Sequence, residues 1–132
     1  MNRQIVNKKN RYKVILIVNR QIVNKKMSKF DKIAVLNKIG STGMVPVFYH
    51  KDAEVAKKVV KACYDGGVRA FEFTNRGDFA HEVFAEVVKF AAKECPEVAM
   101  GVGSIVDPAT AALYLQVGGM FRCRPVVQPG DC

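Results

Sequence analysis

The sequence predicts an α/β protein built on a parallel sheet. Short apolar segments typical of strands alternate with segments in which apolar residues recur at helical spacing. The connections between them are short, and strand–helix–strand order of this kind places successive strands parallel to one another. The repeat of about 25–30 residues fits either a doubly wound sheet or a (β/α)8 barrel.

The first elements follow from local start signals. A helix is expected over residues 30–39, with Ser28 and Asp31 at the spacing of a capping box. The segment MVPVFYH, residues 44–50, is expected to form the first strand. Pro46 lies near the start of this strand, where a missing N–H is tolerated.

A helix after this strand is expected to begin at Asp52, which can cap it, and to stop at Gly66 and Gly67. The second strand is expected at residues 68–74. The apolar stripe of the helix between them is expected to comprise Val55, Val59, Ala62 and Cys63.

The next helix, which follows the second strand, is expected within residues 78–96, and a third strand is expected at residues 99–105. Asp107 as N-cap and Pro108 at the first helical position open a third helix, which the glycine pair at 118–119 closes. The apolar residues of the second helix are Ala80, Val83, Phe84, Val87, Val88 and Ala91.

Glu72 lies in the middle of the second strand, where a parallel sheet normally carries Val or Ile. Strand alternation puts Glu72, Thr74 and Arg76 on one face, with Arg76 at the carboxyl end. One interpretation is structural: a buried ion pair between Glu72 and Arg76 that only fixes packing, or a frayed strand with Glu72 in solvent. The other is a functional site, because a carboxylate among apolar groups is suited to proton transfer and (β/α)8 enzymes carry their active sites at this end.

The segment GVGSI, residues 101–105, ends the third strand and contains two glycines. Glycines there allow a ligand to approach the backbone closely. The G-x-G-x-x-G pattern of dinucleotide sites is incomplete, because Val106 occupies its last position. Ser104 is expected to present a hydroxyl at the carboxyl end of this strand.

The net charge of +9 is concentrated in residues 1–26, which hold eight basic side chains and no acidic one. From residue 27 onward, 13 Lys and Arg are balanced by 12 Asp and Glu, so the body of the protein is nearly neutral. A basic face for nucleic-acid binding is therefore not expected on the folded part.

Residues 1–26 are expected to lie outside the fold. The octapeptide NRQIVNKK occurs at residues 2–9 and again at 19–26. The segment VILIV at 14–18 is too short to span a bilayer, which takes about 20 apolar residues. We expect an upstream extension, with Met27 as the start of the protein proper; a functional basic arm is the alternative.

Metal-ligand and disulfide spacing is absent from the sequence. The cysteines form no C-x-x-C pair, so reduced thiols in a cytoplasmic protein are expected. His50 and His81 are far apart and are expected on a loop and a helix surface rather than as ligands. The four cysteines are Cys63, Cys95, Cys123 and Cys132.

The segments VPVFYH, GGVRAFEFTNR and MGVGSIVDPATAALYLQVG resemble the first part of the 2-keto-3-deoxy-6-phosphogluconate (KDPG) and 4-hydroxy-2-oxoglutarate aldolase family. The resemblance runs from about residue 30 to residue 121. It implies a (β/α)8 TIM barrel, of which this chain covers the first three to four β-α units. It further implies a homotrimer at full length and the use of neither metal nor cofactor.

The reaction implied by the resemblance belongs to sugar-acid breakdown by the Entner–Doudoroff route. It is class I aldol cleavage through a Schiff base between a lysine and the substrate keto group. The products are pyruvate and an aldehyde, either glyceraldehyde 3-phosphate or glyoxylate.

The resemblance also implies roles for individual residues. Glu72 matches the general acid/base glutamate of the family. Arg76 matches the arginine that holds the pyruvate carboxylate, a role suited to a guanidinium fork. Ser104 matches a Thr or Ser at the same end of the substrate, and Thr74 is expected among the substrate-binding residues. Pro125 matches a proline that lines the pocket after the fourth strand.

The chain also departs from the family pattern. The Schiff-base lysine of the family lies on the sixth strand, beyond the units present here, and no other lysine is an obvious substitute. Residues 27–121 are expected to form the N-terminal part of an aldolase barrel. Residues 122–132 are expected to be a divergent tail, with the native reading frame lost, because Arg122 and Arg124 alternate onto one face of a strand that should be buried.

We therefore expect a truncated chain that is inactive alone and poorly stable, because incomplete sheets expose their edges. The alternative from a different class is a non-catalytic fragment that binds an oxo acid or takes part in an interaction. In either case a small 2-oxo acid is the expected partner, with no nucleic acid and no membrane.

Overall fold

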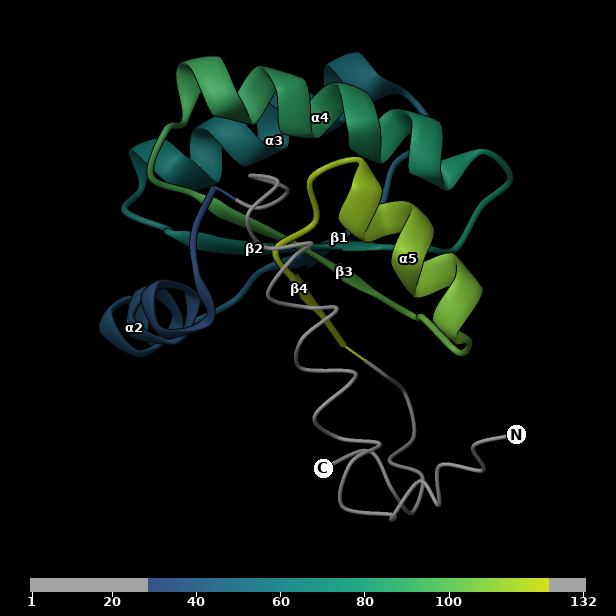
Figure 1. Ribbon diagram of the computed structural model, residues 1–132. Helices are drawn as coiled ribbons and strands as arrows, with labels where there is room; N and C mark the ends of the chain where they lie inside the picture. Colours follow the sequence, from purple (N-terminus) through teal and green to yellow (C-terminus); the bar gives the residue numbers. More distant parts are fainter. Residues whose placement is uncertain (1–28, 124–132) are drawn as a thin grey trace, which may run out of the picture.

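The structure is a computed structural model that describes residues 29–123. Its centre is a parallel sheet of four strands in the order β1-β2-β3-β4 (Figure 1). The strands are β1 (Val47–Phe48), β2 (Ala70–Thr74), β3 (Ala99–Gly103) and β4 (Phe121–Arg122). The helices are α2 (Lys32–Thr42), α3 (Ala53–Asp65), α4 (Ala80–Glu94) and α5 (Pro108–Gln116).

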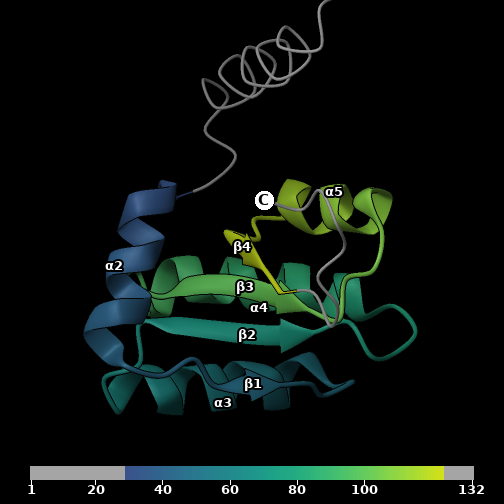
Figure 2. The ribbon, with the colours of Figure 1, turned by 90° about the horizontal axis from the view of Figure 1, so that it is seen from below.

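The sequential order of the strands decides between the two folds that the sequence allowed. Each of α3, α4 and α5 connects one strand to its neighbour, and these helices lie on the same face of the sheet (Figure 1). In a doubly wound sheet the strand order reverses and helices cover both faces. α2 lies at the end of the sheet where the strands begin (Figure 2). The arrangement is that of part of a (β/α)8 barrel, as predicted.

The core between the sheet and the helices is apolar and rich in aromatic rings. Phe71 and Phe73 of β2 are fully buried against the helices. The ring of Phe73 lies 5.9 Å from that of Phe84 on α4, which in turn lies 5.2 Å from the ring of Tyr114 on α5. These pairs lie within the distances at which aromatic rings attract one another, and they join β2, α4 and α5 in one core.

The predicted apolar residues of α4 all lie in or against this core, whereas of the predicted α3 residues only Val59 and Cys63 pack against it. The buried residues of α3 are Ala56 and Val60, whereas Val55 and Ala62 are exposed. The predicted stripe was therefore right at Val59 and Cys63 and wrong at Val55 and Ala62. Periodicity fixes the spacing of a stripe, but the packing of α3 beside α4 on the sheet selects which side of the helix is buried, and the small Ala56 is fully buried.

Helix α2 and strand β1 differ from the prediction at their ends. Asp31 is the N-cap of α2 and accepts a hydrogen bond from Ala34 N at 2.7 Å, so the helix begins at residue 32. β1 comprises two residues instead of the seven predicted. It begins after Pro46, which has no N–H to donate, although Pro46 O accepts from Glu72 N at 2.9 Å. No described helix is long and apolar enough to cross a membrane.

The third helix and the fourth strand form close to where they were expected. Asp107 caps α5 by accepting from Thr110 N at 2.8 Å. Arg122 pairs with Val102 of β3 and is exposed, so its charge does not carry the cost of burial from which the divergent tail was predicted. The reason is that β4 lies at the edge of the described sheet. Arg124 lies outside the described residues.

Candidate active site

Glu72 lies on the face of the sheet opposite α3 and α4. The register aligns Val47, Glu72, Gly101 and Phe121 in one row across the four strands. The neighbours of Glu72 along β2, Phe71 and Phe73, point to the helices instead. Glu72 is half-buried rather than fully buried, because no described helix covers its face.

The carboxyl group of Glu72 packs against the backbone of Gly103 on β3. A Cβ at residue 103 would lie 2.7 Å from Cδ of Glu72, which real Cβ atoms essentially never do. In the same way, a side chain at Gly101 would overlap the ring of Phe121. The two glycines were expected to admit a ligand to the backbone. In the structure they admit side chains of the neighbouring strands.

Cys123 completes the surroundings of Glu72 and was not predicted as a site residue. Its backbone N–H donates to Val102 O at 2.8 Å, which places it beside the end of β3. Burial, and then a hydrogen bond to the Glu72 carboxylate, raise the pKa of the Cys123 thiol to about 11. The sequence signal that could have identified Cys123 is its position two residues after Phe121, because strand alternation then puts Phe121 and Cys123 on the same face of the fourth strand.

Thr74, Arg76 and Ser104 lie at the carboxyl ends of β2 and β3. Thr74 is buried and pairs with Gly103, and Asn75 N donates to Gly103 O at 2.9 Å. Arg76 follows the end of β2 and is exposed. Ser104 follows β3 directly with φ 62, a left-handed conformation that is uncommon for a residue other than glycine. The fold thus brings the residues that follow β2 and those that follow β3 together at the carboxyl end of the sheet.

The packing-only interpretation of Glu72 is not what the structure holds. Of the ion pairs formed within residues 29–123, none joins Glu72 to Arg76. Arg76 is exposed beyond the strand while Glu72 points across β3, so the two groups are available for different partners. Pro125, the remaining predicted site residue, lies outside the described residues.

No lysine among residues 29–123 lies on a strand. Lys57 on α3 is paired with Glu54 at 2.6 Å and with Glu86 at 3.4 Å. The hydrogen bond to Glu54 raises the pKa of Lys57, opposite to the direction that a nucleophilic lysine requires. The others on helices or connections are Lys29, Lys32, Lys38, Lys51, Lys58, Lys61, Lys89 and Lys93.

The histidines lie on a loop and on a helix, as expected. Nδ1 of His50, after β1, accepts a hydrogen bond from Asp52 N at 3.0 Å, and His81 lies on α4. Within the described part of the chain, no three His, Cys, Asp or Glu side chains are grouped so that they could hold a metal ion. Cys63, Cys95 and Cys123 are free thiols.

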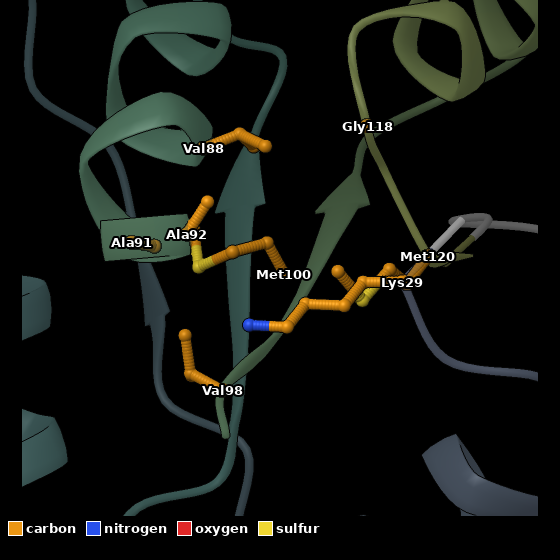
Figure 3. A pocket seen from close by; sticks show the side chains of 8 residues that line it. All are labelled: Lys29, Val88, Ala91, Ala92, Val98, Met100, Gly118 and Met120. Carbon is orange, nitrogen blue, oxygen red and sulfur yellow. The ribbon is translucent and has the colours of Figure 1, made fainter. Parts of the chain in front are cut away.

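A separate cavity of about 100 Å³ lies away from these residues (Figure 3). Val98 precedes β3 and Met120 precedes β4, so the cavity lies where the strands begin, at the opposite end from Arg76. The only charged group in its lining is Lys29, whose aliphatic chain runs along it (Figure 3). It is lined by Lys29, Val88, Ala91, Ala92, Val98, Met100, Gly118 and Met120.

Comparison with known proteins places the chain among aldolases. Residues 35–130 match the model of the KDPG and KHG aldolase family. This match extends past residue 121, near which the motifs that resemble the family end. The "KHG/KDPG aldolase" of Escherichia coli K12 is 34% identical over 82 residues, 62% of this chain. The "2-dehydro-3-deoxy-phosphogluconate aldolase" of Pseudoalteromonas atlantica is 30% identical over 99 residues, 75% of this chain.

The fold agrees with the sequence comparison. The crystal structure of a 2-keto-3-deoxy-6-phospho-gluconate aldolase from Zymomonas mobilis superposes on 64% of this chain, with a TM-score of 0.55 and 25% identity. The matches cover 37% of the Escherichia coli relative, 44% of the Pseudoalteromonas relative and 38% of the Zymomonas chain. The chain therefore spans less than half the length of the relatives that it matches. With a family match over most of its residues, the chain belongs to the KDPG and KHG aldolase family.

Proposed function

We propose that this chain supplies the pyruvate end of a class I aldolase active site. The substrate is a 2-keto-3-deoxy-6-phospho sugar acid or 4-hydroxy-2-oxoglutarate, and the products are pyruvate and glyceraldehyde 3-phosphate or glyoxylate. The place of Glu72 carries the proposal. It is a half-buried carboxylate in the middle of β2, on the face without helices, and it leans over Gly103 toward the carboxyl ends of the strands. In a closed barrel this face points inward.

Arg76 is the proposed carboxylate binder. It follows the end of β2 and is exposed, so its guanidinium is free to take a substrate carboxylate with two parallel hydrogen bonds. Thr74 and Ser104 lie at the same edge and would add hydroxyl groups. The left-handed backbone of Ser104 supports a role at the site, because strain of this kind is concentrated at functional residues. The role of Pro125 rests on the resemblance alone.

The chemistry requires a lysine that the resemblance implies on a later strand of the barrel. Its amine condenses with the substrate keto group and releases water. The bond between C3 and C4 then breaks, the 4-hydroxyl loses its proton, and the aldehyde leaves. Glu72 takes up that proton and returns one to C3 of the resulting enamine, after which hydrolysis releases pyruvate.

A second candidate is a non-catalytic fragment that retains an oxo-acid site. It is favoured by the absence of a strand lysine among residues 29–123. Borohydride reduction of the 132-residue chain with pyruvate distinguishes the candidates, since it fixes a Schiff base as a stable lysine adduct. We expect no adduct with this chain alone. An adduct mapped to one of its lysines would mean that the chain carries its own nucleophile.

The proposed function is tested on the protein as its source cell makes it. The intact mass comes first: about 14.6 kDa corresponds to this chain, whereas a barrel of about 200 residues corresponds to the complete fold. The same mass shows whether residues 1–26 and 122–132 belong to the protein. Pyruvate release from both substrates is then followed with lactate dehydrogenase and NADH. In an active natural protein, Glu72→Gln is expected to lower kcat by about 10²–10⁴, and unchanged turnover would overturn the role of Glu72.

A further inference from the structure

The connection from β2 to α4, residues 75–79, carries Arg76 and has an irregular backbone. Arg76 N donates to Thr74 O at 3.0 Å, which closes a tight turn directly after the strand. Phe79, the N-cap of α4, has φ 56 and makes no capping hydrogen bond with its side chain. A bulky residue in the left-handed region costs free energy and persists only when the surrounding contacts hold it.

The first of these contacts is made by Tyr114 of α5. Its hydroxyl donates to Oδ1 of Asn75 at 2.9 Å, and the Tyr114 side chain is 1% exposed. A buried hydroxyl without a partner is costly, so this hydrogen bond favours one position of Asn75. Asn75 is also held from the other side, since its backbone N–H donates to Gly103 O. The residue before Arg76 is therefore fixed between β3 and α5.

The second contact is made by Tyr49, which follows β1. Its ring packs on Phe73 at 5.6 Å and reaches the backbone of Gly77. A Cβ at residue 77 would lie 2.5 Å from Cζ of Tyr49 and would overlap the hydroxyl as well. Gly77 is thus required for close approach of the phenol ring rather than for its own backbone angles. The residue after Arg76 is therefore fixed against the end of β1.

We propose that Tyr114 with Asn75, and Tyr49 with Gly77, are positioning pairs that set the direction in which Arg76 leaves the sheet. They act through the two peptide units that flank Arg76 and do not touch substrate. The inference rests on the proposed role of Arg76 as carboxylate binder. A guanidinium fork binds a carboxylate with two hydrogen bonds only in a narrow range of orientations. If the backbone of Arg76 already points the side chain in that direction, less conformational freedom of the side chain is lost on binding.

The variants for the test are Tyr114→Phe, which removes one hydroxyl and keeps the ring, and Gly77→Ala, which displaces Tyr49. Tyr64→Phe is the matched control, because Tyr64 is a partly exposed tyrosine of α3. Arg76→Met removes the carboxylate binder itself. Binding of pyruvate to the 132-residue chain and to each variant is followed by the shifts of the backbone amide resonances of Thr74 and Ser104 in ¹⁵N spectra, which every variant retains. Thermal unfolding of each variant confirms that it is folded.

Tyr114→Phe and Gly77→Ala are each expected to weaken pyruvate binding about tenfold, and the control to leave it unchanged. If Arg76→Met abolishes binding while Tyr114→Phe and Gly77→Ala bind like the wild type, the positioning inference fails and the role of Arg76 stands. If wild type and Arg76→Met bind equally, both fail. Heteronuclear NOE values for residues 75–79 without ligand give an independent check. They should fall in both positioning variants, and values equal to the wild type would overturn the inference.

Discussion

The thiol of Cys123 and the carboxylate of Glu72 meet across Gly103, which has no side chain to separate them. Three strands contribute to this contact: Glu72 comes from β2, Gly103 from β3, and Cys123 follows β4. The contact lies over the end of β3, on the face that points inward in a barrel. The proposed general acid/base is thus placed by the sheet itself and not by a flexible loop.

Cys123 should react slowly with alkylating agents at neutral pH. Its pKa is raised from an ordinary 9.0 to about 11, so the reactive thiolate is rare until the pH approaches that value. Iodoacetamide labelling followed by peptide mass mapping should show Cys123 labelled more slowly than Cys63 at pH 8. In Glu72→Gln the negative charge is gone, the pKa of Cys123 falls, and labelling accelerates. Equal rates for Cys123 in the two proteins would contradict the contact.

Gly103→Ala should displace the Glu72 carboxylate. The new Cβ would overlap the Glu72 side chain, so either the side chain or the backbone of β3 must shift. We expect a loss of about 1–3 kcal/mol in the free energy of unfolding, measured by urea titration of the chain.

Gly40→Ala is the control for this substitution. Gly40 lies in α2 with nothing within 4 Å of a new Cβ, so alanine should raise stability by about 0.5–1 kcal/mol. Similar effects of the two substitutions on stability would show that a glycine at residue 103 is not needed for the Glu72 side chain to approach β3.

Features set by local sequence were predictable, and contacts between distant segments were not. Asp107 is read as a cap because its partner lies three residues away. Glu72 stood out because a carboxylate is unusual in a parallel strand. The contact between Tyr114 and Asn75 spans 39 residues. Nothing in either local pattern indicates it, because it depends on how α5 packs on the sheet.

The α3 stripe shows a second limit. Val55 and Ala56 are neighbours of similar apolar character, so the spacing of hydrophobic residues fits a stripe through either one. Which of them is buried depends on how closely α3 can approach the sheet. The smaller side chain of Ala56 permits the closer approach, and this difference is visible only once both layers are in place.

Phe79→Asn should stabilise the chain. Phe79 is 68% exposed, so removing its ring loses little buried surface. Its φ of 56 is costly for a bulky residue but is tolerated by asparagine. We expect a gain of about 0.5–1 kcal/mol by urea titration. Phe79→Ala, which keeps the backbone strain, should give no such gain, and equal gains would exclude strain as the cause.

The stability of the chain should fall between pH 10 and about 12 because of Tyr114. Burial raises the pKa of its hydroxyl from an ordinary 10.0 to about 12. Below pH 10 Tyr114 is protonated in both the folded and the unfolded chain, so its full contribution to the free energy of unfolding is present. Between the two values only the unfolded chain releases the proton, which shifts the equilibrium toward unfolding by up to about 3 kcal/mol. Tyr114→Phe carries no such group, so the difference in unfolding free energy between the two proteins should decrease as the pH rises through this window. Urea titrations of both proteins at pH 9, 10 and 11 measure that difference, and a constant difference would show that Tyr114 does not remain protonated in the folded chain.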